Sequence, residues 1–407
     1  MKIAAICEAV APLSPDIRKT GIERIFMNIN VQNSSPAVPA GSGDKVLRRD
    51  EMPRLFQPLT LRSVTARNRI MVSPMCQYSA TDGVADDWHL QHLGSRAVGG
   101  AGIVSTEVVH VEPRGRITPN CLGLWNDEQR DALARIVRFM KAQGAATAIQ
   151  IGHAGRKGST AQPWQGGKPL SAEAGGWQPI APSPLPCADG YTVPVEMDLD
   201  TIAATLKLFT ASARRAREAG FDIVELHAAH GYLIHEFLSP LSNRRTDRYG
   251  GSFENRIRFL LEAIDAVRSE WPDDMPLFVR LSSVDWMEGG CDLDGTVKLA
   301  QLLKAGGKVD LIDCSSGGLD PRQKIPLFPG YQVQFAAEIR RRAGIATGAV
   351  GLINAPDLAE QILASGQADL IIMARAMLND PYWPLHAAKV LKAKIPWPPQ
   401  YVRGDIF

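Results

Sequence analysis

The chain has 407 residues, of which 45% are hydrophobic and 22% charged, and its formal net charge is +2. This balance is ordinary for a globular protein with a large core, and it favours neither a nucleic acid nor a membrane surface as a partner. The cysteines are too widely spaced for a zinc ribbon or a local iron–sulfur motif, so we expect a reducing, cytoplasmic location. They are Cys7, Cys76, Cys121, Cys187, Cys291 and Cys314.

The beginning of the chain differs in composition from the rest. Residues 32–44 are rich in Ser, Pro, Ala and Gly, which is typical of a linker. We therefore expect residues 1–52 to be an N-terminal extension, partly disordered or appended to the main fold. Residues 53–407 are expected to form a single domain.

From Leu55 onward, short apolar segments alternate with longer amphipathic ones. Residues 55–68 predict a hairpin that could close the bottom of a barrel. The apolar segments that follow predict strands at 69–73, 103–106, 146–151, 223–226, 277–281, 311–314, 345–349 and 370–374. The amphipathic segments predict helices at 127–143, 202–219, 253–270, 293–304, 335–343, 356–364 and 381–389.

This alternation predicts an α/β fold, a (β/α)8 TIM barrel. We favour the barrel over a doubly wound open sheet because eight strands are predicted and no GxGxxG follows the first. Residues 153–197, 236–254 and 317–334 are too long for simple connectors. They follow strands, so a barrel would place them on its C-terminal face, where barrel active sites lie.

Polar side chains lie at the predicted C-terminal ends of the strands. There is no lysine among them, which argues against Schiff-base chemistry. An amide, a cation, hydroxyls, imidazoles and a thiol suit a planar, anionic cofactor, and the last two turns match the usual barrel phosphate site. A phosphorylated flavin fits this set. In chain order the candidates are Ser73, Pro74, Met75, Cys76, Tyr78, Gln150, His227, His230, Tyr232, Arg280, Gly351, Ala374 and Arg375.

The spacing of His227 and His230 leaves other interpretations open. An HxxH pair could bind zinc, but His235 is the only nearby third ligand, so we expect no metal. Judged from the residues alone, two buried structural histidines are as plausible as a functional pair. Glu225 and Asp313 lie within strands and are expected to belong to a structural ion pair.

Several segments carry a resemblance to a known family. They are SPMCQY, QIGHAGRKGS, HAAHGYLIHEFLSPLSNRRTDRYGGSFENR, the strand of Arg280 and the final MARAMLNDP. Together they resemble the Old Yellow Enzyme family of FMN-dependent ene-reductases over residues 55–403. Cys76, where most members have Thr, resembles the thermophilic-like subclass with the xenobiotic reductases. Residues 53–407 would then be an FMN-binding TIM-barrel domain.

The resemblance implies a role for each candidate. Ser73, Pro74, Met75, Cys76 and Val108 would lie along the FMN, Gln150 and Arg280 would bind its pyrimidine side, and Gly351, Ala374 and Arg375 its phosphate. His227 and His230 would bind the oxygen of an activated alkene or nitro substrate, helped by Tyr78, and Tyr232 would donate a proton. NADPH or NADH would supply the hydride.

Three departures and one further likeness accompany the resemblance. Val108 stands where a small Ala is usual, Ala374 stands where Gly is usual, and residues 1–52 have no counterpart. The tail around Arg403 resembles one that reaches into the active site of a neighbouring subunit, which implies a homodimer or a dimer of dimers. The alternative to an NADPH dehydrogenase or ene-reductase is a non-catalytic flavin- or phospholigand-binding barrel, acting as a sensor or partner module.

Overall fold

The computed structural model describes residues 52–405, so the expectation for residues 1–52 lies, except for Met52, outside the described part. Its centre is a closed barrel of parallel strands in the order β10-β11-β12-β3-β4-β5-β8-β9. The strands are β3 (Ile70–Val72), β4 (Ile103–His110), β5 (Ala146–Gly152), β8 (Ile223–Ala228), β9 (Leu277–Ser282), β10 (Leu311–Ser315), β11 (Ala346–Ala349) and β12 (Leu370–Met373). The predicted (β/α)8 barrel is confirmed.

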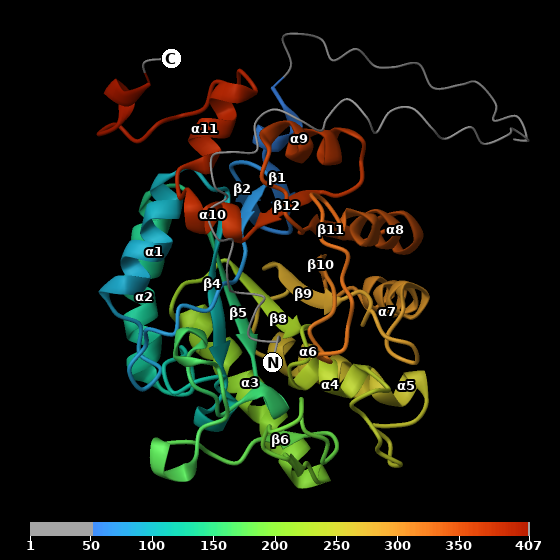
Figure 1. The fold of residues 1–407 in the computed structure, drawn as a ribbon. Coiled ribbons are helices and arrows are strands. Elements are labelled where there is room, and N and C mark those ends of the chain that lie inside the picture. Colours follow the sequence, from blue (N-terminus) through green and yellow to red (C-terminus); the bar gives the residue numbers. More distant parts are fainter. Residues whose placement is uncertain (1–51, 406–407) are drawn as a thin grey trace, which may run out of the picture. The chain divides into compact units, whose positions relative to one another are not determined.

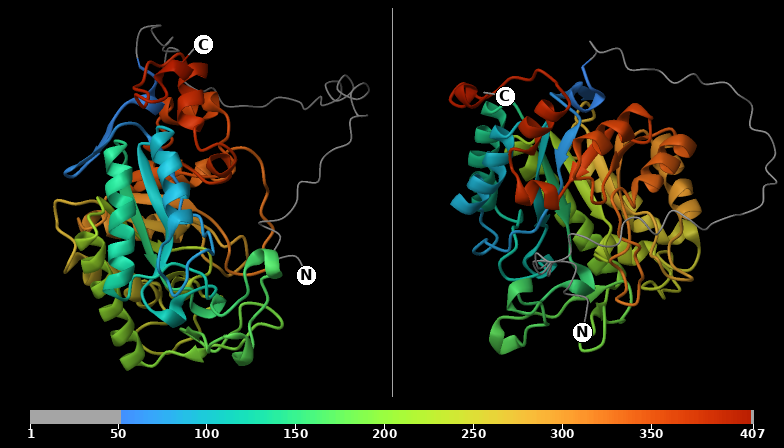
Figure 2. Two further views of the ribbon diagram at one scale, coloured as in Figure 1. Left: turned by 90° about the vertical axis from the view of Figure 1, so that its left-hand side faces the viewer. Right: turned by 45° about the horizontal axis from the view of Figure 1, so that its top comes forward.

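Helices surround the strands (Figures 1 and 2). Their ends follow local capping chemistry: Asn126 accepts the backbone N–H of Gln129, whose side chain returns the bond in a capping box at α2. The helices are α1 (Asp87–Val98), α2 (Asp127–Ala142), α3 (Leu199–Glu218), α4 (Leu233–Leu238), α5 (Phe253–Arg256), α6 (Arg258–Arg268), α7 (Leu293–Ala305), α8 (Val333–Ala343), α9 (Pro356–Ala364), α10 (Arg375–Asn379) and α11 (Trp383–Val390).

Some predicted bounds need correction. The helix predicted at 253–270 is divided into α5 and α6 at Ile257, and α4 occupies the start of the loop predicted at 236–254. Helices α1, α4 and α10 were not predicted. The last two have only six and five residues, which is too short to present a hydrophobic periodicity.

The predicted hairpin is present as β1 (Leu59–Leu61) and β2 (Val64–Ala66), paired antiparallel. Leu59 and Ala66 pack in one buried cluster with Phe278, Leu311 and other side chains from the first residues of the barrel strands. The hairpin therefore covers the N-terminal end of the barrel, opposite the long loop after β5 (Figure 1). The C-terminal end of the barrel, where the candidate site residues lie, is therefore not covered by the hairpin.

The long loop after β5 contains a small two-stranded sheet of β6 (Ile180–Ala181) and β7 (Val195–Glu196), which pair parallel. The loop after β10 runs to α8. Both follow the C-terminal ends of strands, as predicted. Among residues 52–405, no helix combines the length and the hydropathy needed to span a bilayer.

The cluster beneath the hairpin yields a stability prediction. Phe278→Ala should lower the free energy of unfolding by about 3–5 kcal/mol, because it leaves a cavity where a fully buried ring packed. Phe328→Ala is the matched control: its ring is half exposed, and the change should stay within about 0.5 kcal/mol. Denaturant unfolding at equal FMN loading measures both, and equal effects would contradict the packing described here.

Candidate active site

Two histidines and a tyrosine meet at the end of β8. His227 lies within the strand, and His230 and Tyr232 follow in the turn that leads into α4. The ring of His227 is edge-on to both neighbours, with centroids 5.2 Å from His230 and 4.8 Å from Tyr232. His227 Nε2 and His230 Nδ1 are 3.4 Å apart, so the two rings turn nitrogens toward one another. One small polar group could therefore contact both imidazoles.

Both imidazoles are held in their neutral form. Burial, followed by the positive charge of Arg280, lowers the pKa of His227 and of His230 well below the ordinary value. The backbone N–H of Ala229 donates to His227 Nδ1 at 3.2 Å, so the single proton of this neutral ring is on Nε2, the atom that faces His230. His230 Nε2 lies 2.7 Å from the Ser315 hydroxyl.

Tyr232 also contacts side chains from the segment after β3 and from β4. Cys76 and Tyr78 pack with Val108 and with Tyr232 in one small cluster. Burial, then the nearby Glu107 carboxylate, raises the pKa of the Cys76 thiol well above its ordinary value, while a hydrogen bond from Tyr78 acts in the other direction. Cys76 is therefore a protonated thiol at neutral pH.

Val108 fills space close to His227. A Cβ placed on Gly152 would lie 2.7 Å from Val108 Cγ2 and 3.1 Å from His227 Cβ, so only glycine fits between β4 and β8 at this level. A methyl group of Val108 thus occupies space beside the histidine.

Two polar pairs lie side by side in the barrel wall. Gln150 donates through Nε2 to Glu225 at 2.7 Å, and Arg280 Nε lies 3.0 Å from Asp313. Asp313 is thus in the structural ion pair expected from the sequence, whereas Glu225 accepts from an amide. Burial, followed by the charge of Asp313, raises the pKa of Glu225 to about 8. These contacts fix the direction of the Gln150 amide and the Arg280 guanidinium.

The expected phosphate-binding residues lie at the ends of β11 and β12. Gly351 has a φ of +127°, which favours glycine, and its carbonyl accepts from Gly330 at 2.7 Å. Ala374 precedes α10 with a φ of −102°, which lies outside the left-handed region that favours glycine. An alanine therefore fits this backbone conformation without strain. Arg375 is exposed. Partial burial raises the pKa of the Tyr331 hydroxyl, and the charges of Arg375 and Arg280 act against that shift.

The donor set fits FMN. A fixed amide and a guanidinium suit the hydrogen-bonding edge of the ring, and an exposed arginine beside a glycine turn suits the phosphate. The backbone N–H of Ser73 donates to the Met373 carbonyl at 2.9 Å, which continues the pairing of β3 with β12. The segment 73–76 therefore begins beside the end of β12.

Arg403 is the one predicted site residue that the described chain keeps apart from the others. It is exposed in the short turn Val402–Gly404, after α11. That end of the chain lies with the hairpin, away from the loop after β5 (Figure 1). Within one chain Arg403 therefore does not join the residues at the end of β8.

Several residues that hold the predicted ones were not predicted from the sequence. Ser282 and Ser315 are the last residues of β9 and β10, so the strand-end rule that selected the others would also have found them. Lys157 lies within the QIGHAGRKGS segment; its Nζ donates to the His230 carbonyl at 2.7 Å and lies 5.5 Å from the Tyr232 ring centre. A lysine whose partners are backbone carbonyls carries no signal of its own in the sequence.

Comparisons with known proteins agree with this site. Residues 54–394 match the model of the NADH:flavin oxidoreductase / NADH oxidase family. The NADPH dehydrogenase of Bacillus subtilis (strain 168) is 48% identical, covering 86% of this chain and 99% of the relative. That of Geobacillus sp. (strain WCH70) is 50% identical, covering 86% and 98%.

Solved structures give the same picture. An Old Yellow Enzyme homologue from Zymomonas mobilis has a TM-score of 0.70 at 27% identity, covering 85% of this chain and 94% of its own. A complex of 2-naphthoyl-CoA reductase has a TM-score of 0.75 at 29% identity over 83% of this chain, which spans about half, 52%, of that longer protein. The relatives are named as enzymes, which favours catalysis over a sensor or partner module. The chain therefore belongs to the NADH:flavin oxidoreductase / NADH oxidase family, as an FMN-dependent oxidoreductase of the Old Yellow Enzyme type.

Proposed function

We propose that this enzyme is an ene-reductase, which uses NADPH or NADH to reduce the C=C bond of α,β-unsaturated carbonyls, maleimides or nitro compounds. The observation that carries the proposal is the meeting of two neutral imidazoles and one phenol at the end of β8. Activated alkenes need this combination: hydrogen-bond donors for an oxygen that gains negative charge, and an acid beside the carbon that must be protonated.

His227 and His230 form the oxygen clamp. His227 offers its Nε2–H directly, because Nδ1 already accepts from Ala229. A serine hydroxyl can either accept or donate, so Ser315 permits both tautomers of His230. When Ser315 donates to Nε2, the His230 proton moves to Nδ1, which then points at the same oxygen as His227. Neutral donors bind a carbonyl or nitro oxygen and stabilise the charge that develops on it.

Tyr232 is the proton donor for the α-carbon. Its ring is fixed edge-on to His227, and Lys157 lies over its face. Bound FMN, reduced by the nicotinamide cofactor, supplies the hydride to the β-carbon. Tyr78 contributes to binding the substrate oxygen, and Cys76, Val108 and Tyr78 close the space around the alkene.

The cofactor is held by residues 73–76, by Gln150 and Arg280 at the ring, and by Gly351, Ala374 and Arg375 at the phosphate. Residues 53–407 act as one FMN-binding domain. We further propose a homodimer or dimer of dimers in which Arg403 completes the substrate site of the neighbouring subunit. The exposure of Arg403, and the position of the C-terminal segment toward the hairpin end of the barrel (Figure 1), support this arrangement.

Removing both clamp donors tests the role of the histidines. The double variant His227→Ala/His230→Ala should lose binding of phenol ligands and lower kcat/KM for an enone, by roughly 3 kcal/mol of transition-state stabilisation for each donor. Ligand titration and stopped-flow reoxidation by 2-cyclohexenone measure these effects, with FMN content as the control for folding. Unchanged kinetics would rule out the clamp.

Removing the phenol oxygen of Tyr232 tests whether this residue is the proton donor. Tyr232→Phe keeps the packing of the ring and removes only the acidic group, so enone reduction should slow while reduction of FMN by NADPH continues. The two half-reactions are measured separately under anaerobic conditions. An equal loss in both would assign Tyr232 to binding or packing instead.

The state of Cys76 can be checked by alkylation. Because its pKa is raised, little thiolate exists at pH 8.5, and iodoacetamide should label Cys76 of the native holoenzyme far more slowly than in the unfolded chain. Glu107→Gln removes a negative charge that contributes to the raised pKa, so labelling should accelerate. Mass spectrometry of the Cys76 peptide follows the rates. Rapid labelling of the native enzyme, or no response to Glu107→Gln, would contradict the electrostatic account.

A further inference from the structure

The turn after β8 has an unusual backbone. His230 and Gly231 both have left-handed conformations, with φ of +59° and +74°. Glycine adopts this conformation freely, but a histidine rarely does, so the surroundings must hold it. A Cβ on Gly231 would lie 2.5 Å from the Gly318 carbonyl oxygen, so the turn is also pressed against the loop after β10. The turn sets the directions of both His230 and Tyr232.

Side chains from elsewhere in the chain hold the polar backbone groups of this turn. The His230 N–H donates to Ser282 Oγ at 2.9 Å, and the His230 carbonyl accepts from Lys157 Nζ at 2.7 Å. The Gly231 N–H donates to Nδ1 of His235 at 2.8 Å. His235 is the third residue of α4 and has no part in the clamp proposed above.

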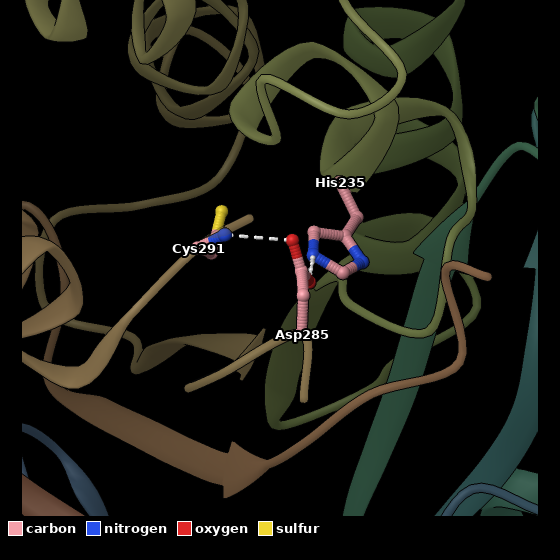
Figure 3. Close-up of side chains that lie close together, drawn as sticks. All are labelled: His235, Asp285 and Cys291. Atoms are coloured by element: carbon pink, nitrogen blue, oxygen red, sulfur yellow. Dashed lines mark hydrogen bonds and ion pairs between the residues drawn. The ribbon is translucent and has the colours of Figure 1, made fainter. Parts of the chain in front are cut away.

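His235 is in turn fixed by a buried carboxylate (Figure 3). Its Nε2 lies 2.9 Å from Asp285 Oδ1, and both residues are buried. The other oxygen, Oδ2, accepts from the Ser239 hydroxyl at 2.6 Å and from the Cys291 N–H at 2.7 Å. Burial alone would raise the pKa of Asp285, but His235 and these donors outweigh it, so the pKa is lowered and the carboxylate is charged.

The same three residues invite a metal interpretation. The ligand atoms of His235, Asp285 and Cys291 all lie within 4.8 Å of one another. However, His235 Nδ1 accepts a backbone N–H, so the neutral ring carries its proton on Nε2, the atom that faces Asp285. A metal ion would have to displace that proton and leave an imidazolate. The contacts therefore suit a polar relay, from Asp285 through His235 to the Gly231 N–H, better than a metal ligand.

We propose that His235 and Asp285 are a positioning pair for the reaction. Asp285 fixes the tautomer and orientation of His235, and Nδ1 of His235 then holds the Gly231 N–H, which keeps His230 on the substrate oxygen and Tyr232 beside the α-carbon. This inference rests on the proposed function, because it assigns the pair a role through the two residues named there.

Three substitutions of His235 separate this role from general stability. His235→Asn places an amide oxygen near the Nδ1 position and can still accept from Gly231. His235→Leu removes the acceptor, and His235→Gln keeps a polar contact toward Asp285 but offers no acceptor at that position. Val267→Ala is the control: it trims a buried side chain of α6 and lowers stability without touching the turn.

The readouts are the Kd of the oxidised FMN holoenzyme for p-hydroxybenzaldehyde, the rate of reoxidation by 2-cyclohexenone, the FMN content and the Tm. The leucine and glutamine variants should weaken phenol binding and slow reoxidation by roughly tenfold or more, since a small misplacement of catalytic groups is costly. The asparagine variant should retain most of both. Val267→Ala should lower Tm and leave the Kd and the rate unchanged.

Either of two results would overturn the positioning role: wild-type Kd and rate in both the leucine and glutamine variants, or an equal loss in Val267→Ala at matched Tm. If the leucine variant does not fold, the glutamine and asparagine variants make the same comparison. If the wild-type enzyme is reduced by NADPH but not reoxidised by enones, the proposed function fails instead, and the phenol Kd still reports on the turn.

Discussion

Pairing of β12 with β3 is the interaction on which the site depends. Ile371, Ile372 and Met373 align with Ile70, Met71 and Val72, and this pairing joins the last strand to the first. Residues that are 300 positions apart in the sequence, such as Ser73 and Met373, become hydrogen-bonded neighbours. Because every barrel strand is parallel, all the strand ends that carry polar groups face the same mouth, and the hairpin closes the opposite end.

Exclusion of water sets the chemistry of this mouth. The same burial that keeps His227 and His230 uncharged keeps Cys76 protonated, so the site holds neutral donors rather than ions. Two charged groups that remain have polar partners close by: Arg280 lies beside Asp313, and the Asp285 carboxylate accepts from the Ser239 hydroxyl and the Cys291 N–H. Neutral N–H and O–H groups held in fixed positions can stabilise negative charge that develops on a substrate, because no ion pair has to be broken first.

The sequence predicted the barrel because strand and helix periods alternate regularly, and it predicted that polar side chains gather at one mouth because strand ends converge in such a fold. The clamp role of two of these side chains was implied only by the family resemblance. It could not predict how the residues at those ends are held. The left-handed turn at His230, the carbonyl partners of Lys157 and the relay from Asp285 through His235 join segments 50 or more positions apart, such as His235 and Asp285. Those partnerships arise only from packing, and a lone buried histidine or lysine looks the same whether or not it has them.

Lys157 has a wider consequence for how this enzyme can change. It stands five positions after the end of β5, yet its ammonium group ties together the carbonyls of His230 and Gly318 from two other loops. The rest of the loop after β5 is therefore not needed to hold these two carbonyls. At Gly166, Gly175 and Gly190 an added Cβ would meet nothing within 4 Å. Evolution or an engineer could therefore lengthen or exchange the outer loop there and alter which molecules reach the mouth, while the geometry beneath is inherited intact.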